Sequence, residues 1–213
     1  VGPPSRRTVT IHNTSSVHDL VVTDASLAIS FEGFCDEFPQ TTINPENWTI
    51  TKGLPTVDSV GISEPSEPYS LRLNGNPSGG DGVESRILDL SGLTDLEVTY
   101  WYQRTGGGED PDTGEDLVIS YWNGFNWVEI DRQLGNGIDM TYFEQRNIAL
   151  PPEAYHANFK LQISNTGTSG AYDDWLVDNV SIDFATSGVD NSVTNGQGSI
   201  HLDALPWLHF ENE

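Results

Sequence analysis

The stretch Ala171-Tyr-Asp-Asp-Trp-Leu-Val-Asp-Asn-Val-Ser-Ile-Asp-Phe184 decides the fold class of this chain. With the two-residue period of a β-strand, one face of the stretch carries the apolar side chains of Leu176, Val180, Ile182 and Phe184. Asp178 falls in the same row, so we expect it to face the hydrophobic core. A carboxylate there costs several kcal/mol unless it is paired, protonated or bound to a cation. The stretch therefore predicts a core strand whose aspartate requires a partner.

The charge of the chain is strongly one-sided. Its 213 residues include 9 Lys and Arg against 32 Asp and Glu, which gives a formal net charge of −23. Because such a field repels phosphate groups, we expect no binding to nucleic acid, whereas metal cations are attracted. No apolar run approaches the length of a membrane span, so membrane insertion is not expected. No signal peptide is found, and from its start at Val1-Gly-Pro-Pro we expect the chain to be a processed or excised piece of something longer.

The chain has a single cysteine, Cys35. It excludes an internal disulfide framework and a thiolate metal site, and it leaves the redox compartment open. A lone cysteine is expected to be a small buried apolar residue.

Short alternating runs fill most of the chain, and clusters of Gly, Asn, Asp, Pro and Ser separate them. No segment longer than a turn has a helical period, so the pattern predicts an all-β sandwich or barrel. The expected core strands are 48–51, 56–60, 69–73, 83–90, 96–102, 116–121, 127–130, 143–149, 159–163 and the opening stretch. We assign 27–184 to one sandwich domain, 1–26 to an N-terminal hairpin or the end of a preceding repeat, and 185–213 to a linker or docking tail.

Several motifs follow one another in a fixed order: Phe31-Glu-Gly-Phe and Trp48; Ser85-Arg-Ile-Leu-Asp-Leu-Ser-Gly-Leu, Leu96-Glu-Val-Thr-Tyr-Trp-Tyr and Asp116-Leu-Val-Ile-Ser-Tyr-Trp-Asn-Gly-Phe-Asn-Trp; and Asp173-Asp-Trp-Leu-Val-Asp-Asn-Val-Ser-Ile. In them the chain resembles the jelly-roll modules of the MAM and bacterial cleaved-adhesin type, which are built into large secreted surface proteins and enzymes. The resemblance covers residues 31–184. It implies a two-sheet antiparallel β-sandwich whose first and last strands are neighbours, often with a structural Ca²⁺ near them. Because the paired cysteines of animal MAM domains are missing, the bacterial branch is the closer match.

Glu32 and Asp178 are the leading metal-ligand candidates. Ca²⁺ takes six to eight oxygen ligands, and the two carboxylates would meet if the first and last core strands pair. Asp81, in a glycine-rich loop, is a candidate third ligand. In the alternative interpretation, Glu32 is exposed to solvent and Asp178 accepts hydrogen bonds from backbone N–H groups at a strand end.

A second acidic stretch, residues 109–116, has the alternate spacing of calcium loops at Asp110, Asp112 and Asp116. The bidentate Glu of a complete EF-hand loop is missing from its expected place. A solvated acidic hairpin tip is therefore the competing interpretation.

Aromatic and amide side chains meet at a predicted hairpin that contains Trp122, Asn123 and Phe125. Flat rings beside amide groups are typical of carbohydrate-binding surfaces, so these three residues are candidate ligand contacts. Most aromatic side chains of a sandwich belong to the core, and we expect Trp127 there.

A catalytic function is not expected. Glu129 and Asp131 resemble the start of the catalytic strand of sandwich-fold glycoside hydrolases, which need two carboxylates at the scissile bond. The next alternate positions are Gln133 and Gly135, so the second catalytic carboxylate is lacking.

Taken together, the residues and the resemblance predict a non-catalytic, calcium-stabilised, secreted or cell-surface module for adhesion or carbohydrate binding within a larger protein. The competing hypothesis is a structural subunit of a surface layer, filament or multidomain complex that contacts only protein. The expected partners are accordingly glycans or other protein subunits.

Overall fold

The computed structural model describes residues 33–185, except 76, 78 and 169–171. Six strands form one antiparallel sheet: β1 (Phe34–Asp36), β3 (Thr56–Asp58), β4 (Ser70–Leu73), β6 (Leu96–Arg104), β9 (Glu144–Ala149) and β11 (Trp175–Phe184). Five strands form the other: β2 (Trp48–Lys52), β5 (Gly82–Ser85), β7 (Leu117–Trp122), β8 (Trp127–Gln133) and β10 (Leu161–Asn165). A 3₁₀ turn, η1, spans Pro152–Ala154. None of the helical turns within the described residues has the length and apolarity needed to cross a membrane.

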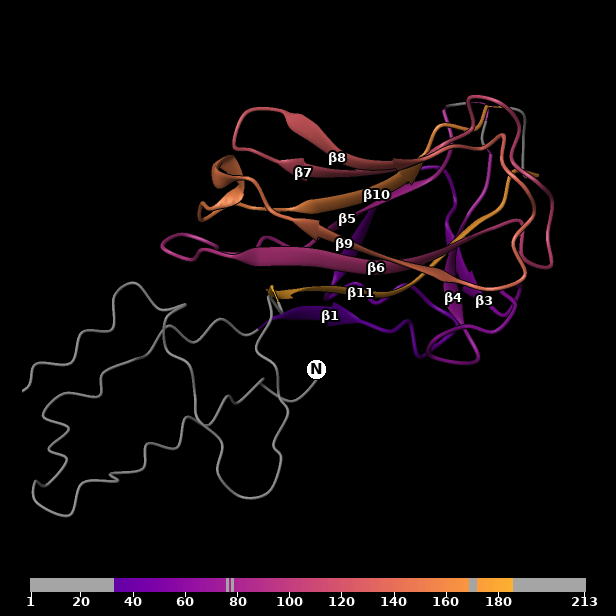
Figure 1. Ribbon diagram of the computed structural model, residues 1–213, viewed down its shortest axis with the longest axis horizontal. Coiled ribbons are helices and arrows are strands. Elements are labelled where there is room, and N and C mark those ends of the chain that lie inside the picture. Colours follow the sequence, from indigo (N-terminus) through magenta and orange to yellow (C-terminus); the bar gives the residue numbers. More distant parts are fainter. Residues whose placement is uncertain (1–32, 76, 78, 169–171, 186–213) are drawn as a thin grey trace, which may run out of the picture.

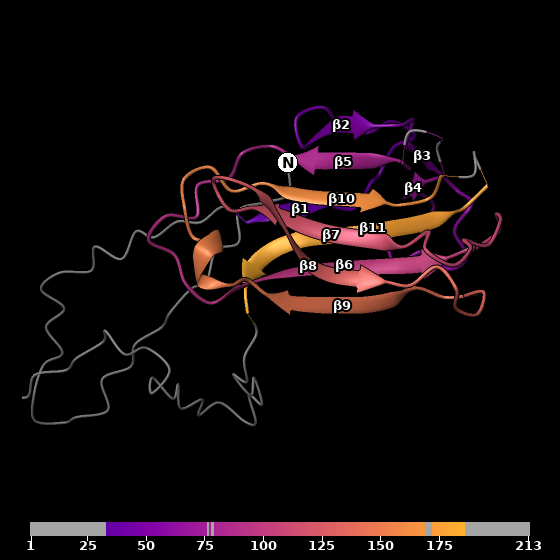
Figure 2. The ribbon, with the colours of Figure 1, turned by 90° about the horizontal axis from the view of Figure 1, so that it is seen from above.

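The two sheets pack face to face as a sandwich (Figure 1). The strand order is β3-β4-β11-β6-β9 in the first sheet, with β1 beside β11, and β2-β5-β10-β7-β8 in the second (Figure 2). All pairs of neighbouring strands are antiparallel. The predicted all-β, two-sheet antiparallel sandwich is therefore confirmed.

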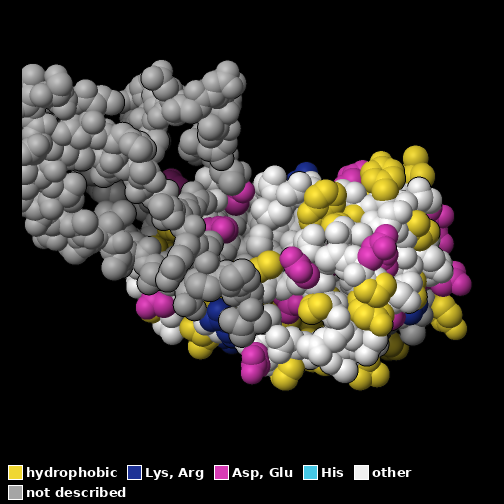
Figure 3. All heavy atoms as spheres, turned by 90° about the horizontal axis from the view of Figure 1, so that it is seen from below, with side chains coloured by type: hydrophobic (Ala, Val, Ile, Leu, Met, Phe, Trp, Pro, Cys, Tyr) yellow, Lys and Arg dark blue, Asp and Glu magenta, His cyan; other side chains and the backbone are white. Residues whose placement is uncertain are grey.

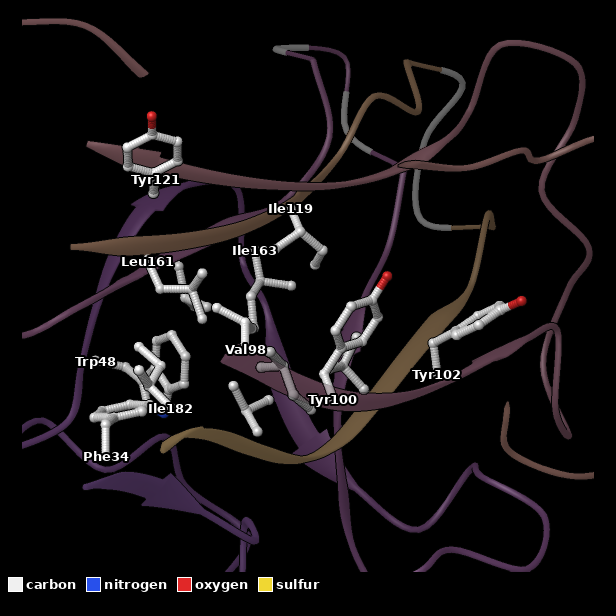
Figure 4. Packing of buried hydrophobic residues seen from close by; sticks show 14 of the residues in the cluster. Phe34, Trp48, Val98, Tyr100, Tyr102, Ile119, Tyr121, Leu161, Ile163 and Ile182 are labelled. Carbon is white, nitrogen blue, oxygen red and sulfur yellow. The ribbon is translucent and has the colours of Figure 1, made fainter. Parts of the chain in front are cut away.

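The hydrophobic core lies between the sheets and follows the two-residue period of the strands. On β6, Leu96, Val98 and Tyr100 are fully buried, whereas Trp101 lies on the opposite face and is partly exposed. Figure 4 shows Ile119 of the second sheet across from the β6 side chains. Burial of each such apolar side chain contributes about 1.5–3 kcal/mol. The alternation seen in the sequence therefore sets the faces of this central strand correctly.

Strand β11 breaks that alternation with a β-bulge. Asp178 pairs with Trp101 of β6, but the next paired residue, Ser181, lies opposite Thr99, so β11 holds one extra residue. Asn179 takes up the irregularity with a left-handed φ of 47°. As a result, Val177 before the bulge and Val180 after it both face the core.

The predicted face of Asp178 is consequently wrong. Leu176 and Asp178 point to the outer side of the six-stranded sheet, away from the core residues with which they were expected to align. Both side chains are nonetheless fully buried. A periodicity of two cannot reveal a bulge, because the inserted residue exchanges the faces of everything beyond it.

Residues 59–69, the covering loop, bury this part of the outer face. The side-chain amide of Gln103 accepts from the backbone N–H of Ile62 at 2.9 Å and donates to its carbonyl oxygen at 2.9 Å. The backbone N–H of Gly107 donates to the Val60 carbonyl at 2.8 Å. These bonds hold the covering loop against β6, above Leu176.

β1 and β4 share one edge of β11. β4 pairs with Trp175–Val177, and β1 pairs with Val180–Ile182, so the bulge lies where the two strands part. β1, the first described strand, is thus a neighbour of β11, as the resemblance implies. Cys35 of β1 is exposed, which corrects the expectation of a buried residue. The predicted segment 1–26 and all but the first residue of the predicted segment 185–213 lie outside the described residues.

Candidate functional site

The carboxylate of Asp178 lies at the gap between β1 and β4 and accepts hydrogen bonds from the covering loop. The Ser66 backbone N–H donates to Oδ2 at 3.0 Å, and the Asn179 backbone N–H donates to Oδ1 at 2.8 Å. The Ser66 hydroxyl lies 2.8 Å from Oδ1 and 2.9 Å from the Glu37 carbonyl oxygen. Asp178 therefore accepts backbone hydrogen bonds, as the alternative interpretation of the sequence proposed.

The same carboxylate has no counter-ion among the described side chains. Burial raises the pKa of Asp178, and the nearby charge of Glu64 raises it further against the lowering effect of the Ser66 and Asn179 hydrogen bonds. Glu64 Oε1, on the residue whose charge acts on Asp178, is buried without a hydrogen-bond partner, and so is Asn179 Oδ1. Buried acceptors without a donor are rare in proteins, so these two oxygens call for an explanation.

The two other predicted metal ligands have different outcomes. Glu32 lies outside the described residues, so its place as a ligand stays a prediction. Asp81 is buried and uses one carboxylate oxygen for the Leu54 backbone N–H at 2.8 Å and the other for the Asn74 backbone N–H at 3.0 Å. Across residues 33–185, as far as they are described, no three His, Cys, Asp or Glu side chains gather in a metal-binding cluster.

The second acidic stretch forms a loop whose carboxylates serve different purposes. Asp110 and Asp112 are exposed. Asp116 is buried, forms an ion pair with Nη1 of Arg132 at 2.8 Å and accepts the Gly135 backbone N–H at 3.0 Å. On the face that Figure 3 shows, acidic side chains are spread among hydrophobic ones and do not form one patch.

The aromatic hairpin is built around Asn123. Its side-chain oxygen accepts the backbone N–H groups of Phe125 at 2.9 Å and Asn126 at 2.8 Å, so it stabilises the turn. Gly124 adopts the left-handed φ of 97° that this tight turn requires. Phe125 is 84% exposed at the tip. Asn123 is therefore a turn-forming residue in this structure, and Phe125 is open to solvent.

Trp122 and Trp127 lie opposite each other at the base of this hairpin, with ring centroids 5.6 Å apart in an edge-to-face arrangement. Both are partly exposed. Tyr121 points into the core, so its neighbour Trp122 points outward, and Trp127, the cross-strand partner of Trp122, lies on the same outer face. The prediction that Trp127 belongs to the core is wrong. The turn places Trp127 directly across from Trp122, and hairpin pairing could have revealed this from the sequence.

The two indoles line a groove of about 320 Å³ on the outer face of the five-stranded sheet. We call it the tryptophan groove; its lining residues are Glu84, Ile87, Trp122, Trp127, Asn158 and Lys160. Lys160 and Glu84 form an ion pair at 2.8 Å within it. Sequence reasoning missed these two residues, because β5 and β10 become neighbours only through the sheet order.

His156 fixes the wall beside the groove. Its Nε2 lies 2.9 Å from the Trp122 carbonyl oxygen, which can only accept, so Nε2 carries the proton. Nδ1 then accepts the Asn158 backbone N–H at 3.1 Å. This pair of bonds ties the chain before β10 to the end of β7, and so it positions Asn158 next to Trp122.

The two carboxylates considered for catalysis are held by arginines. A hydrogen bond from Arg132 lowers the pKa of Glu129. Burial acts to raise the pKa of Asp131, but hydrogen bonds from Arg146 at 2.9 Å and the Tyr100 hydroxyl at 2.8 Å bring it below the ordinary value. A general acid for glycoside hydrolysis needs a raised pKa. Neither carboxylate provides one.

No protein-family model matches the chain, and no curated protein sequence is significantly similar to it. Solved structures do match. The K2 cleaved adhesin domain of Lys-gingipain is 14% identical with a TM-score of 0.52, and the match covers 71% of this chain and 99% of that domain. The K3 cleaved adhesin domain of Lys-gingipain from Porphyromonas gingivalis is 12% identical with a TM-score of 0.47, covering 70% and 97%. The CBM22-1 xylan-binding domain from Paenibacillus barcinonensis Xyn10C is 16% identical with a TM-score of 0.47, covering 73% and 95%.

The match to the K2 domain establishes a shared fold. It confirms the predicted jelly-roll sandwich and supports the cleaved-adhesin part of the resemblance at the level of the fold. The MAM part of the resemblance stays a prediction.

Proposed function

We propose that this chain is a non-catalytic extracellular module that binds carbohydrate through the tryptophan groove and acts in adhesion. The observation that carries the proposal is the edge-to-face pair of partly exposed indoles, Trp122 and Trp127, on the outer face of a sheet. Two large aromatic rings that remain partly in water lack the favourable free energy that full burial of their apolar surface would provide. A ligand with apolar C–H faces would recover that energy.

The polar rim of the groove suits the hydroxyl groups of a sugar. Glu84 offers acceptors, Lys160 offers donors, and Asn158 offers both. Because the Glu84–Lys160 ion pair already balances its own charge, the groove favours a neutral ligand over an ion. Shallow, open grooves of this kind accept a chain passing along the surface, so the ligand we expect is an oligosaccharide.

The non-catalytic part of the proposal rests on Glu129 and Asp131, whose arginine partners lower both pKa values. The acidic composition, with a net charge of −23, suits solubility in a salty extracellular medium. The fold shared with a cleaved adhesin domain is compatible with such a role.

Calcium stabilisation also belongs to the proposal, centred on Asp178. Three donors occupy its carboxylate, which has about four lone-pair positions, so an acceptor position is left for a cation. The unpartnered buried oxygens of Glu64 and Asn179 fit a hard, oxygen-seeking ion such as Ca²⁺. Bound there, the ion would supply the positive charge that Asp178 lacks. Glu32 remains a predicted further ligand, and Asp81 is a weaker one because backbone N–H groups engage both of its oxygens.

The proposal is tested on a glycan array followed by calorimetry with the best oligosaccharide. Trp122→Ala and Trp127→Ala should each weaken binding at least tenfold, which corresponds to about 1.4 kcal/mol. Leu54→Ala removes another exposed apolar side chain, outside the groove, and should leave binding unchanged. Circular dichroism checks that the variants remain folded.

The competing hypothesis, a structural subunit that contacts only protein, makes the opposite prediction. It expects no binding across the array, together with assembly that increases with protein concentration in sedimentation experiments. That combination would exclude the carbohydrate-binding proposal.

A further inference from the structure

We infer that the module has a second binding site, for a single neutral sugar unit, at the end of β6. A pocket of about 480 Å³ opens there between β6 and the residues that lead into β9. The residues that matter are Tyr102, Arg104, Asp139, Met140, Tyr142 and Glu144, and we call this site the tyrosine pocket. Its volume falls within the range of small-ligand pockets. In Figure 4 the Tyr102 hydroxyl points away from the labelled core residues.

One wall of the tyrosine pocket is the loop between β8 and β9, and Arg104 of β6 holds this loop in place. Its guanidinium donates to the carbonyl oxygens of Leu134, at 3.0 Å, and Ile138. The backbone of Met140 adds a bond to the Arg104 carbonyl at 3.2 Å and a parallel bridge to Thr105. Because these contacts hold the loop before any ligand arrives, little ordering entropy remains to be lost on binding.

Glu144 supplies an acceptor that is already oriented. Tyr102 donates to one of its carboxylate oxygens at 2.9 Å, and Tyr142 approaches the other at 3.4 Å. Burial and the Glu144 charge raise the pKa of Tyr102 to about 12, so its hydroxyl keeps its proton.

The lining charges disfavour an anionic ligand. Asp139, Glu144 and the net charge of −23 repel an anion, and Arg104 offsets one of the two lining carboxylates. A sugar hydroxyl can donate to a carboxylate and accept from a guanidinium. The ring of Tyr142 is 57% exposed and offers an aromatic face to the C–H side of a pyranose.

The tyrosine pocket shares no residue with the tryptophan groove, and the two belong to different sheets. The inference therefore goes beyond the proposed function and does not depend on it. Two separate sites on one module would allow a branched glycan, or two chains of a matrix, to be held with avidity.

The test is an NMR titration of the whole chain with xylotriose, cellotriose, mannotriose and β-1,4-galactotriose at millimolar concentration. We expect at least one of them to shift the backbone amide signals of residues 138–144. Tyr142→Ala should weaken that response about tenfold, the equivalent of about 1.4 kcal/mol. Glu144→Gln, which keeps the shape but removes the charge, should weaken it as well.

Two controls separate this site from the groove. Tyr172→Ala removes a tyrosine that is 64% exposed and does not line the pocket, and it should leave the titration unchanged. Trp122→Ala should also leave the signals of residues 138–144 responsive. The inference is overturned if none of the four sugars shifts those signals, if Tyr142→Ala binds like the natural chain, or if Trp122→Ala abolishes their response.

Discussion

Asp174 and Asp178 are two fully buried aspartates only four residues apart; Asp174 lies just before β11 and Asp178 lies within it. The charge of Asp174 is neutralised by an internal cation, whereas that of Asp178 is not. Arg72 donates two parallel hydrogen bonds to the Asp174 carboxylate, from Nε at 2.7 Å and from Nη2 at 2.9 Å. The Glu109 backbone N–H donates a third at 2.9 Å. Asp178 has only neutral donors from Ser66 and Asn179 and lies near the charge of Glu64.

The difference shows how burial alone fails to identify a functional carboxylate. Both side chains lose water to the same extent, but only Asp174 receives an internal cation, in the bidentate geometry that stabilises such pairs best. Asp178 is left with an unbalanced charge, which is why we assign the calcium proposal to it and a purely structural role to Asp174.

Breaking the compensated pair should have the largest effect. Arg72→Met leaves the Asp174 carboxylate buried without its cation, so we expect the free energy of unfolding to fall by about 3–5 kcal/mol. Urea denaturation measures this loss, which should be the same with Ca²⁺ and with a chelator.

Lys160→Met is the matched control, because it removes one partner of the more exposed Lys160–Glu84 pair. There we expect a loss below about 1 kcal/mol. Equal losses for the two variants would contradict the role given to Arg72.

Removal of calcium should have the next largest effect. At a Ca²⁺ concentration 100 times its dissociation constant, binding adds about 2.7 kcal/mol to stability. For a domain of this size that corresponds to a rise in melting temperature of about 5–10 °C. Differential scanning calorimetry with Ca²⁺ and with a chelator should show the rise in the natural chain and its loss in Asp178→Asn.

Asp112→Asn separates the two candidate calcium regions, because it alters the exposed acidic loop and leaves Asp178 intact. We expect it to keep the calcium-dependent rise. If the natural chain has no such rise, the calcium part of the proposal fails.

The pH dependence of Asp178 should be the smallest effect. Burial raises its folded-state pKa above the unfolded value, so its contribution to stability is present below the unfolded pKa and is lost as the pH rises through the folded pKa. With a chelator present, Asp178→Asn should therefore gain stability relative to the natural chain as the pH is raised from acidic to neutral values. Urea denaturation at several pH values measures this difference.

Added Ca²⁺ should reverse that trend, because a bound cation stabilises the ionised carboxylate. Asp110→Asn makes the same change in net charge at an exposed position and corrects for it. A stability difference between Asp178→Asn and the natural chain that does not change with pH would show that Asp178 keeps an ordinary pKa.

Most strands could be predicted because their signal is local. In β6 the apolar residues Leu96, Val98 and Tyr100 alternate within one short segment. The β7–β8 hairpin is predicted by the turn residues Asn123-Gly124. The strand at Phe34–Asp36 was not predicted: Phe34 and Cys35 are two apolar residues in a row, so the segment shows no alternation. The predicted domain boundaries at residues 26 and 184 remain predictions.

The candidate site was only partly predictable, since its members come from distant parts of the chain. Trp122 was identified through its aromatic hairpin, but Glu84 and Lys160 become neighbours through β5–β10 pairing. Ser66 and Glu64 carry no sequence signal that links them to Asp178. Their covering loop follows no period, and its position depends on Gln103.

Local sequence patterns were enough to predict the all-β class, the positions of most strands along the chain, the two faces of β6 and the unusual presence of Asp178 within an apolar strand. Alternation and turn residues act over a few neighbours, so these features needed no tertiary information. Three features could be seen only in the folded chain: the bulge of β11 that leaves Asp178 on the outer face, the covering loop that buries it there, and the ion pair of Arg72 with Asp174. Those outcomes depend on contacts between residues far apart in the chain, which the two-residue period of a single strand does not encode.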